Sequence, residues 1–221
     1  MSATLVGCAV FLAMMAGLFV PLEYLFPARA TRPSWRSMAL GAALFVINTV
    51  LMQLISARLW SSVQLTSVRR SALIIVVVFI ASDFAGYWIH RAMHRVPWLW
   101  RFHRVHHEAT ELSWLDAWRQ HPVDFVLHGI VVGLPGAMLG ATLSDLASVV
   151  VLRKAFTTFL HANLNVSFGV WLASPAFHAR HHSADERDYD THFAGTFPVW
   201  DVVFGTYRAD VTRLAKTAPS L

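Results

Sequence analysis

Residues 103–107 read His-Arg-Val-His-His, and residues 178–182 read His-Ala-Arg-His-His. A shorter unit of the form His-x-x-x-His occupies residues 90–94. Residues three and four positions apart share one face of an α-helix, so each unit would point its imidazoles in one direction. Such spacings are typical of metal ligands. The sequence therefore predicts a helical metal site built from eight histidines: His90, His94, His103, His106, His107, His178, His181 and His182.

The histidines are clustered along the chain. Of the 12 histidines, six lie between His90 and His121 and five between His161 and His192, which leaves only His128 apart. Histidines that serve only in hydrogen bonds or at membrane interfaces have no reason to group in this way. The clustering therefore favours ligand roles over isolated structural roles.

The composition places the chain in a membrane. Hydrophobic residues make up 56% of the 221 residues, charged residues make up 14%, and the mean hydropathy is +0.48. An average soluble domain has about a quarter of its residues charged. A helix needs roughly 20 apolar residues to cross a bilayer. Five runs come near this length: residues 3–22, 37–57, 71–89, 125–144 and 155–173.

We predict an all-α fold, an integral membrane bundle of four to five transmembrane helices with a cytoplasmic histidine-rich cap. Three crossings before His90 and a return hairpin after His121 would put both histidine clusters on one side of the membrane. Cytoplasmic loops are enriched in arginine. The arginines that indicate a cytoplasmic site are Arg29, Arg32, Arg36, Arg91, Arg95, Arg101 and Arg104. Arg58, Arg69 and Arg70 lie in the second loop and do not fit this orientation. The membrane would be the cytoplasmic membrane in a bacterium or the endoplasmic reticulum in a eukaryote.

Cysteine usage and charge exclude several classes of protein. The single cysteine, Cys8, rules out an internal disulfide, an iron–sulfur cluster and a cysteine-type zinc site. The net charge of +5 is compatible with a nucleic-acid partner, but arginines that flank membrane helices account for the charge. We expect no nucleic-acid partner.

Prolines predict where the two five-residue units begin new helices. Pro97 and Pro175 precede the units, and proline is favoured in the first turn of a helix. The residues before them, Val96 and Ser174, are biased away from helical geometry. We expect the chain to break after His94 and again after residue 173.

One face of the helix that ends at His94 carries two other polar residues in addition to its two histidines. Asp83, Tyr87, His90 and His94 are spaced by four, three and four residues and share a face. An ionisable residue in an apolar run usually marks function, and a ligand histidine commonly donates to a carboxylate. Asp83 and Tyr87 are therefore candidate catalytic residues, with Asp83 expected to orient a histidine. The alternative is an Asp83 that pairs with a nearby arginine.

The ligand type does not identify the metal. Neutral imidazoles suit zinc, copper, iron and nickel alike. A structural zinc needs four ligands, so eight histidines indicate two metal ions near each other. A pair of irons would give such a site a purpose in a membrane, which is to activate dioxygen against an unreactive C–H bond.

The order and spacing of four motifs resemble the fatty acid hydroxylase/sterol desaturase superfamily. Residues 83–94 read Asp-x-x-x-Tyr-Trp-x-His-Arg-x-x-His, and the two five-residue histidine units come after them. Residues 200–207, Trp-Asp-x-x-Phe-Gly-Thr-Tyr, are similar to the ending found in that superfamily. The resemblance extends from about residue 75 to residue 208.

This resemblance implies a non-heme diiron oxygenase that uses dioxygen and two electrons to hydroxylate or desaturate a lipid such as a fatty acyl chain or a sterol. It also implies ligands between the two units, where His121 and His161 match the pattern. We accordingly divide the chain into N-terminal transmembrane helices over 1–74, a catalytic domain over 75–208 and a C-terminal tail over 209–221. Residues 183–221 would cover the site.

Two regions depart from the expected pattern. His192 stands where relatives usually have an amide, and Ala194 stands where they usually have a glycine. His192 is therefore a spare ligand or no ligand at all. Arg153 and Lys154 precede the fifth apolar run, so that helix begins after them, or their charged ends reach an interface.

The electrons must come from another protein, because the chain has neither a cysteine cluster nor a glycine-rich dinucleotide motif. An acidic ferredoxin or a cytochrome could dock on the arginines around the histidine region. Two alternative functions stay open. One is a carotenoid hydroxylase, whose first histidine unit usually has a longer spacing, and the other is a non-enzymatic membrane protein that binds or transports metal.

Overall fold

The computed structural model describes residues 2–60, 72–109, 111–141 and 143–209. These residues form helices and loops, with two isolated β-bridges and no β-strand among them, so the all-α prediction is confirmed for this part of the chain. The elements in chain order are α1 (Ser2–Leu25), α2 (Trp35–Trp60), α3 (Ala72–Arg95), α4 (Pro97–His107), the 3-10 helix η1 (Trp114–Trp118), α5 (Pro122–Met138), α6 (Leu143–His161), α7 (Pro175–His181), the 3-10 helix η2 (Glu186–Asp188) and α8 (Val199–Val203).

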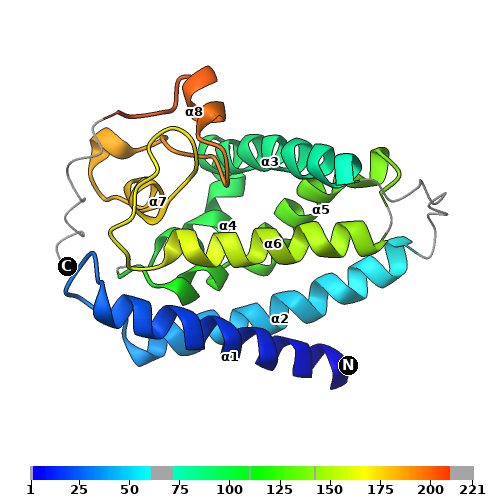
Figure 1. Cartoon of the computed structure of the whole chain (residues 1–221), viewed down its shortest axis with the longest axis horizontal. Coiled ribbons are helices and arrows are strands. Elements are labelled where there is room, and N and C mark those ends of the chain that lie inside the picture. The colour runs from blue at the N-terminus through cyan, green and yellow to red at the C-terminus, as the bar shows by residue number, and fades with distance from the viewer. Residues whose placement is uncertain (1, 61–71, 110, 142, 210–221) are drawn as a thin grey trace.

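The long helices lie alongside one another, and the short elements gather towards one end of the bundle (Figure 1). α1 packs on α2, α3 packs on α4 and α5, and α6 packs on α7. α5 returns the chain after α4, so that α3 and α6 both end where α4 and α7 lie. The early and late histidine clusters therefore reach the same end of the molecule, as the predicted return hairpin requires.

Three of the described helices are long and apolar enough to cross a membrane. They are α1, the Trp35–Ser56 part of α2, and α3, and α5 is a shorter apolar helix. The apolar runs predicted at 3–22, 37–57, 71–89 and 125–144 thus correspond to α1, α2, α3 and α5.

The fifth predicted run is wrong in its position. α6 spans Leu143–His161, so it begins before residue 155 and ends well before residue 173. Its two basic residues lie inside the helix and are accommodated by neighbours. Arg153 forms an ion pair with Asp83 of α3 at 3.1 Å, and the Lys154 ammonium lies 4.7 Å from the centre of the Trp118 ring. Because the bundle supplies these partners, the helix does not need to begin after its charges.

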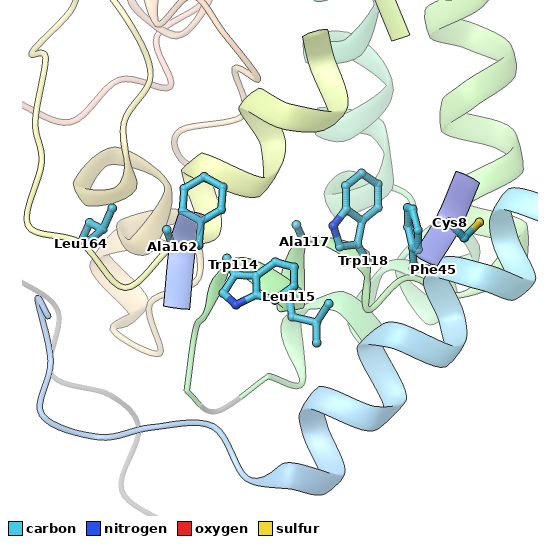
Figure 2. Packing of buried hydrophobic residues seen from close by; sticks show 9 residues of the cluster. Cys8, Phe45, Trp114, Leu115, Ala117, Trp118, Ala162 and Leu164 are labelled. Carbon is cyan, nitrogen blue, oxygen red and sulfur yellow. The ribbon is translucent and has the colours of Figure 1, made fainter. Parts of the chain in front are cut away.

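The short helix η1 joins the N-terminal helices to the rest of the bundle. Figure 2 shows Trp114, Leu115, Ala117 and Trp118 of η1 within a buried apolar cluster that also includes Cys8, Phe45, Ala162 and Leu164. η1 packs against both α2 and α6. A Cβ on Gly41 of α2 would lie 2.9 Å from the Leu115 carbonyl oxygen, so this close approach requires glycine. The cluster fixes the end of α6, which carries His161.

Both predicted helix starts are confirmed. α4 begins at Pro97 after an extended Val96, and α7 begins at Pro175 after an extended Ser174. The Ser174 hydroxyl oxygen accepts a hydrogen bond from the Phe177 N–H, which caps α7. α4 and α7 are thus separate short helices that can be aimed independently of α3 and α6. The predicted tail over 209–221 lies, from residue 210 onward, outside the described residues.

Candidate metal centre

Nine histidines form two compact groups, and within each group the ligand nitrogens all lie within 4.8 Å of one another. We call them the five-histidine group and the four-histidine group. The five-histidine group contains His90, His94, His103, His107 and His181, and the four-histidine group contains His106, His161, His178 and His182. All eight histidines predicted from the motif spacing belong to one group or the other, and His161 is the ninth.

Each group is assembled from three segments. α3 and α4 each contribute two members of the five-histidine group, and His181 of α7 completes it. The four-histidine group takes His106 from α4, His161 from the last residue of α6, and His178 and His182 from α7 and its C-cap. The groups are adjacent, because the rings of His107 and His182 stack with their centres 4.2 Å apart. α4 and α7 therefore supply both groups at once.

The spacing of the ring nitrogens fits metal coordination. In the four-histidine group, the Nε2 atom of His161 lies 3.1 Å from that of His106 and 3.0 Å from that of His178. In the other group, the Nε2 atoms of His181 and His107 are 3.1 Å apart. With metal–nitrogen bonds of about 2.1 Å, neighbouring ligands lie about 3.0 Å apart around an octahedral ion and about 3.4 Å apart around a tetrahedral one. The nitrogens thus have the separation expected of ligands to a shared ion.

Hydrogen bonds on the outer ring nitrogens decide which nitrogen faces inward. The Nδ1 atoms of His90, His161 and His181 contact the backbone carbonyl oxygens of Phe193, Thr157 and Thr191 at 2.8 to 2.9 Å. A carbonyl oxygen can only accept, so each Nδ1 carries the proton and each neutral ring keeps its lone pair on Nε2. Three inward nitrogens, His90 Nε2, His94 Nε2 and His103 Nε2, are buried without a hydrogen-bond partner. A cation would satisfy these lone pairs.

Asp124 is a functional candidate that the motifs did not reveal. Its Oδ2 atom lies 3.0 Å from His103 Nδ1, and both side chains are almost fully buried. This is the carboxylate contact that ligand histidines commonly make. Asp124 lies in the first turn of α5, three residues after His121. The sequence feature that could have pointed to Asp124 is an acidic residue at the start of an apolar helix.

Burial favours the neutral form of five of the site imidazoles. The pKa values of His106, His107, His178 and His182 are lowered well below 6.5, first because burial disfavours the imidazolium and then because neighbouring histidines would repel it. The pKa of His181 is lowered to about 3 for the same first reason. These five rings thus present unprotonated nitrogens, which metal binding requires.

Asp83 has partners other than histidine. Its Oδ1 atom pairs with Arg153, and its Oδ2 atom accepts hydrogen bonds from the Phe197 N–H and from Trp200 Nε1. The alternative of an arginine pair is therefore what the structure contains. Asp83 ties α3 to α6 and to the segment that leads into α8.

Tyr87 also has its hydrogen-bond partners outside the two groups. Its hydroxyl lies 3.0 Å from Thr206 Oγ1 and receives a hydrogen bond from Arg91. The side chain is fully buried in a cluster with Phe177 and Phe193. Tyr87 thus links α3 to the C-terminal end of the described chain.

Two other candidate histidines lie outside both groups. His121 is the N-cap of α5, where its Nδ1 atom accepts a hydrogen bond from the Val123 N–H. His192 is buried, and its Nε2 atom accepts a hydrogen bond from the Arg208 N–H. Each therefore has a local structural contact in place of a position among the gathered nitrogens.

Glu23 of α1 holds the loops on either side of the site. Its Oε1 atom accepts hydrogen bonds from the backbone N–H groups of Trp114 and Asn163, each at 2.8 Å. Asn163 follows His161 by two residues, and its side chain bonds both the N–H and the carbonyl of Arg29. The N-terminal helix thereby takes part in fixing His161.

The sequence of this chain is similar to a family of known enzymes. A family model described as fatty acid hydroxylase matches residues 75–206. A protein of Dictyostelium discoideum with a provisional name as a methylsterol monooxygenase is 26% identical over 221 residues. The ornithine lipid hydroxylase OlsE of Rhizobium tropici is 26% identical over 136 residues, and the alkylglycerol monooxygenase of Homo sapiens is 27% identical over 135 residues.

These similarities differ in extent. The alignment with the Dictyostelium protein covers 90% of this chain and 79% of that protein. The alignments with the hydroxylase of Rhizobium and the human monooxygenase each cover 60% of this chain but only 41% and 30% of those proteins. No solved structure matches the chain.

Proposed function

Since the chain belongs to the fatty acid hydroxylase family, whose model covers residues 75–206, we propose that it is a membrane-bound non-heme diiron enzyme that hydroxylates or desaturates a lipid. The observation that carries this proposal is the gathering of nine histidine side chains into two adjacent groups. A protein that needed only one structural ion would have no use for the second group.

The proposed ligands are the members of the two groups, one iron ion to each group. His121 is left out of the ligand set because its ring nitrogen contacts the α5 backbone. Two iron ions held in this way would supply the chemistry of reducing dioxygen and breaking an unactivated C–H bond. Hydroxylation puts one oxygen atom of O2 into that bond and reduces the other to water, which consumes two electrons and two protons.

The contribution of the chain is to hold neutral imidazoles in fixed orientations. Three rings are held by backbone carbonyl oxygens, and the His103 ring is held by Asp124. Most of these groups are buried, so bulk water is kept from the reacting atoms. For Asp83 and Tyr87 we propose supporting roles, in which they attach α3 to the C-terminal segment.

The substrate that we propose is a lipid with an apolar chain or ring system. The names of the relatives refer to methylsterols, an ornithine lipid and alkylglycerols, all of which carry unactivated C–H bonds. Three helices long and apolar enough to cross a bilayer would keep the site next to such molecules. We propose 75–208 as the catalytic part of the chain and 1–74 as its membrane anchor.

The electron source that we propose is a separate ferredoxin or cytochrome on the cytoplasmic side. Arg95, Arg101 and Arg104 are exposed around α4 and would attract an acidic partner. The site would face the cytoplasm, in agreement with the arginines that come after the first helix.

The test is a turnover experiment with protein purified in detergent, loaded with ferrous iron and supplied with dioxygen, a reduced ferredoxin and a lipid extract. We expect lipids whose mass increases by one oxygen atom, or decreases by two hydrogen atoms, and that take up label from 18O2 in the first case. Protein that binds iron yet yields neither product would contradict the proposal and favour a metal-binding role.

Two variants with the same substitution provide a matched control. His178→Asn removes a member of the four-histidine group and should abolish product formation. His121→Asn changes a histidine outside both groups and keeps an acceptor at the N-cap, so turnover should stay near the wild-type rate. Equal loss in both variants would count against the proposed ligand set.

A further inference from the structure

One short stretch of chain, residues 190–194, orients two members of the five-histidine group. The Thr191 carbonyl oxygen accepts a hydrogen bond from His181 Nδ1 at 2.8 Å, and the Phe193 carbonyl oxygen accepts one from His90 Nδ1 at 2.9 Å. His181 lies on α7 and His90 lies on α3, so this stretch holds ligands from two different helices.

The stretch has an unusual backbone. Asp190 and His192, which flank Thr191, have φ angles of 57° and 59°. Residues other than glycine rarely adopt this region, and they stay in it only when the surrounding structure imposes it. The direction of the Thr191 carbonyl therefore depends on contacts that hold the stretch in place.

Asp201 supplies such contacts. Its buried carboxylate accepts hydrogen bonds from the Phe193 N–H at 2.8 Å, the Ala194 N–H at 2.9 Å and the Thr206 hydroxyl at 2.6 Å. The Ala194 N–H and the Phe193 carbonyl belong to the same planar peptide group. Asp201 holds one edge of that plane, and His90 donates to the other edge.

Thr206 restrains the second peptide group in the same way. Its carbonyl oxygen accepts a hydrogen bond from the His192 N–H at 3.0 Å. That N–H shares a planar peptide with the Thr191 carbonyl, which receives the His181 ring proton. The two restraints are connected, because the Thr206 hydroxyl donates to Asp201.

We propose that Asp201 is a positioning residue for metal binding: through two peptide groups it aims His90 and His181 into the five-histidine group and sets the affinity of that group alone. The inference rests on the two-metal centre of the proposed function. We expect the four-histidine group to keep its affinity, because the outer nitrogen of its member His161 donates to Thr157 within α6 and not to this stretch. Hydrogen bonds to the outer nitrogen of a ligand histidine typically alter metal affinity about 10- to 100-fold.

Metal retention tests the proposal without any measurement of turnover. Metal-free protein in detergent is loaded with cobalt(II), which reports nitrogen ligands by its visible absorption, and is then titrated with a chelator. Wild-type protein should retain two ions per chain at low chelator concentration. Asp201→Asn places an amide N–H against a backbone N–H, so one ion should be lost at a roughly 10- to 100-fold lower chelator concentration while the other is unaffected.

Matched variants separate positioning from general damage. Asp116 is also a buried carboxylate and accepts hydrogen bonds from the Ser113 N–H and hydroxyl, but it lies in η1, so Asp116→Asn should leave both ions bound as in wild type. Thr206→Val should weaken the same single ion as Asp201→Asn, and Thr206→Ser, which keeps the hydroxyl, should restore it. The Thr206 pair also decides the question if Asp201→Asn does not fold.

Either of two results would overturn the proposal. One is unchanged retention of both ions in Asp201→Asn and in Thr206→Val, and the other is equal weakening of both ions. A wild-type chain that binds only one ion would instead contradict the two-metal centre, and the proposed function would fail together with this inference.

Discussion

At the scale of single residues, the ligand nitrogens depend on the groups behind them, and Asp124 is the clearest case. Its carboxylate accepts from the outer nitrogen of His103, whereas the outer nitrogens of His90, His161 and His181 donate to backbone carbonyls. We expect Asp124→Asn to weaken retention of the ion in the five-histidine group about 10- to 100-fold. The chelator titration of cobalt-loaded protein measures this. An unchanged titration would show that the His103 ring is held by packing alone.

The buried imidazoles should also make the folded chain sensitive to acid. The pKa of His181 falls from 6.5 to about 3 on folding because burial disfavours the imidazolium, and the pKa values of His106, His107, His178 and His182 are lowered as well. As the pH falls below 6.5, these histidines bind protons in the unfolded chain but not in the folded chain. The free energy of unfolding therefore decreases towards acid pH and does not depend on these histidines above neutrality. Each such histidine contributes up to about 1.4 kcal/mol per pH unit.

Metal-free protein should therefore melt at a lower temperature at pH 5 than at pH 7.5, and the difference should shrink in His181→Gln. Thermal unfolding in detergent at the two pH values measures this. The same melting temperature at both would mean that the imidazoles are not neutral in the folded chain.

The residues that sequence patterns revealed are those whose spacing is fixed by a helix. The eight motif histidines have three- and four-residue intervals, so their grouping was predictable. The partners of their outer nitrogens were not predictable, because Phe193 and Thr191 act through backbone carbonyls that any residue possesses. His121 and His161 both matched the superfamily pattern as single histidines between the two five-residue units. Only the packing of α6 on α7 brings His161, and not His121, to the gathered nitrogens.

At the scale of elements, the pair between Asp83 and Arg153 connects α3 to α6 inside the bundle. The Asp83 side chain is fully buried, and that of Arg153 is 15% exposed. Removal of one partner leaves an uncompensated charge, which typically costs about 3 to 5 kcal/mol, whereas removal of both is often far milder. We expect Arg153→Leu to lower the melting temperature strongly and Asp83→Asn/Arg153→Leu to recover much of the loss. A double variant whose loss of melting temperature equals the sum of the losses in the two single variants would contradict this pairing.

The same pair explains why the position of α6 was not read from hydropathy. The sequence shows two adjacent basic residues before an apolar run, and hydropathy alone then puts the helix start after them. The bundle instead places Arg153 against Asp83 and Lys154 against the rings of Phe45 and Trp118. Tertiary partners thus decide where this helix begins, whereas the helices that start at Pro97 and Pro175 are set by local backbone chemistry.

At the scale of the whole molecule, metal binding should stabilise the bundle. The two groups draw ligands from α3, α4, α6 and α7, so ions bound to them join elements that are far apart in the sequence. A ligand that binds only the folded state at 100 times its dissociation constant adds about 2.7 kcal/mol of stability. We expect removal of metal with a chelator to lower the melting temperature and re-addition of iron or cobalt to restore it. His178→Asn should respond less than wild type, and His121→Asn should respond equally.

The short helix α4 has a consequence for how such a centre can change during evolution. It carries His103 and His107 for one group and His106 for the other within Pro97–His107. An inserted or deleted residue between these positions would rotate the remainder of the helix by about 100° and misdirect ligands of both ions together. Length variation should therefore not be tolerated within α4. Descendants of this chain can lose the two ions together by one such change, whereas the loss of a single ion requires a substitution that acts on one group alone.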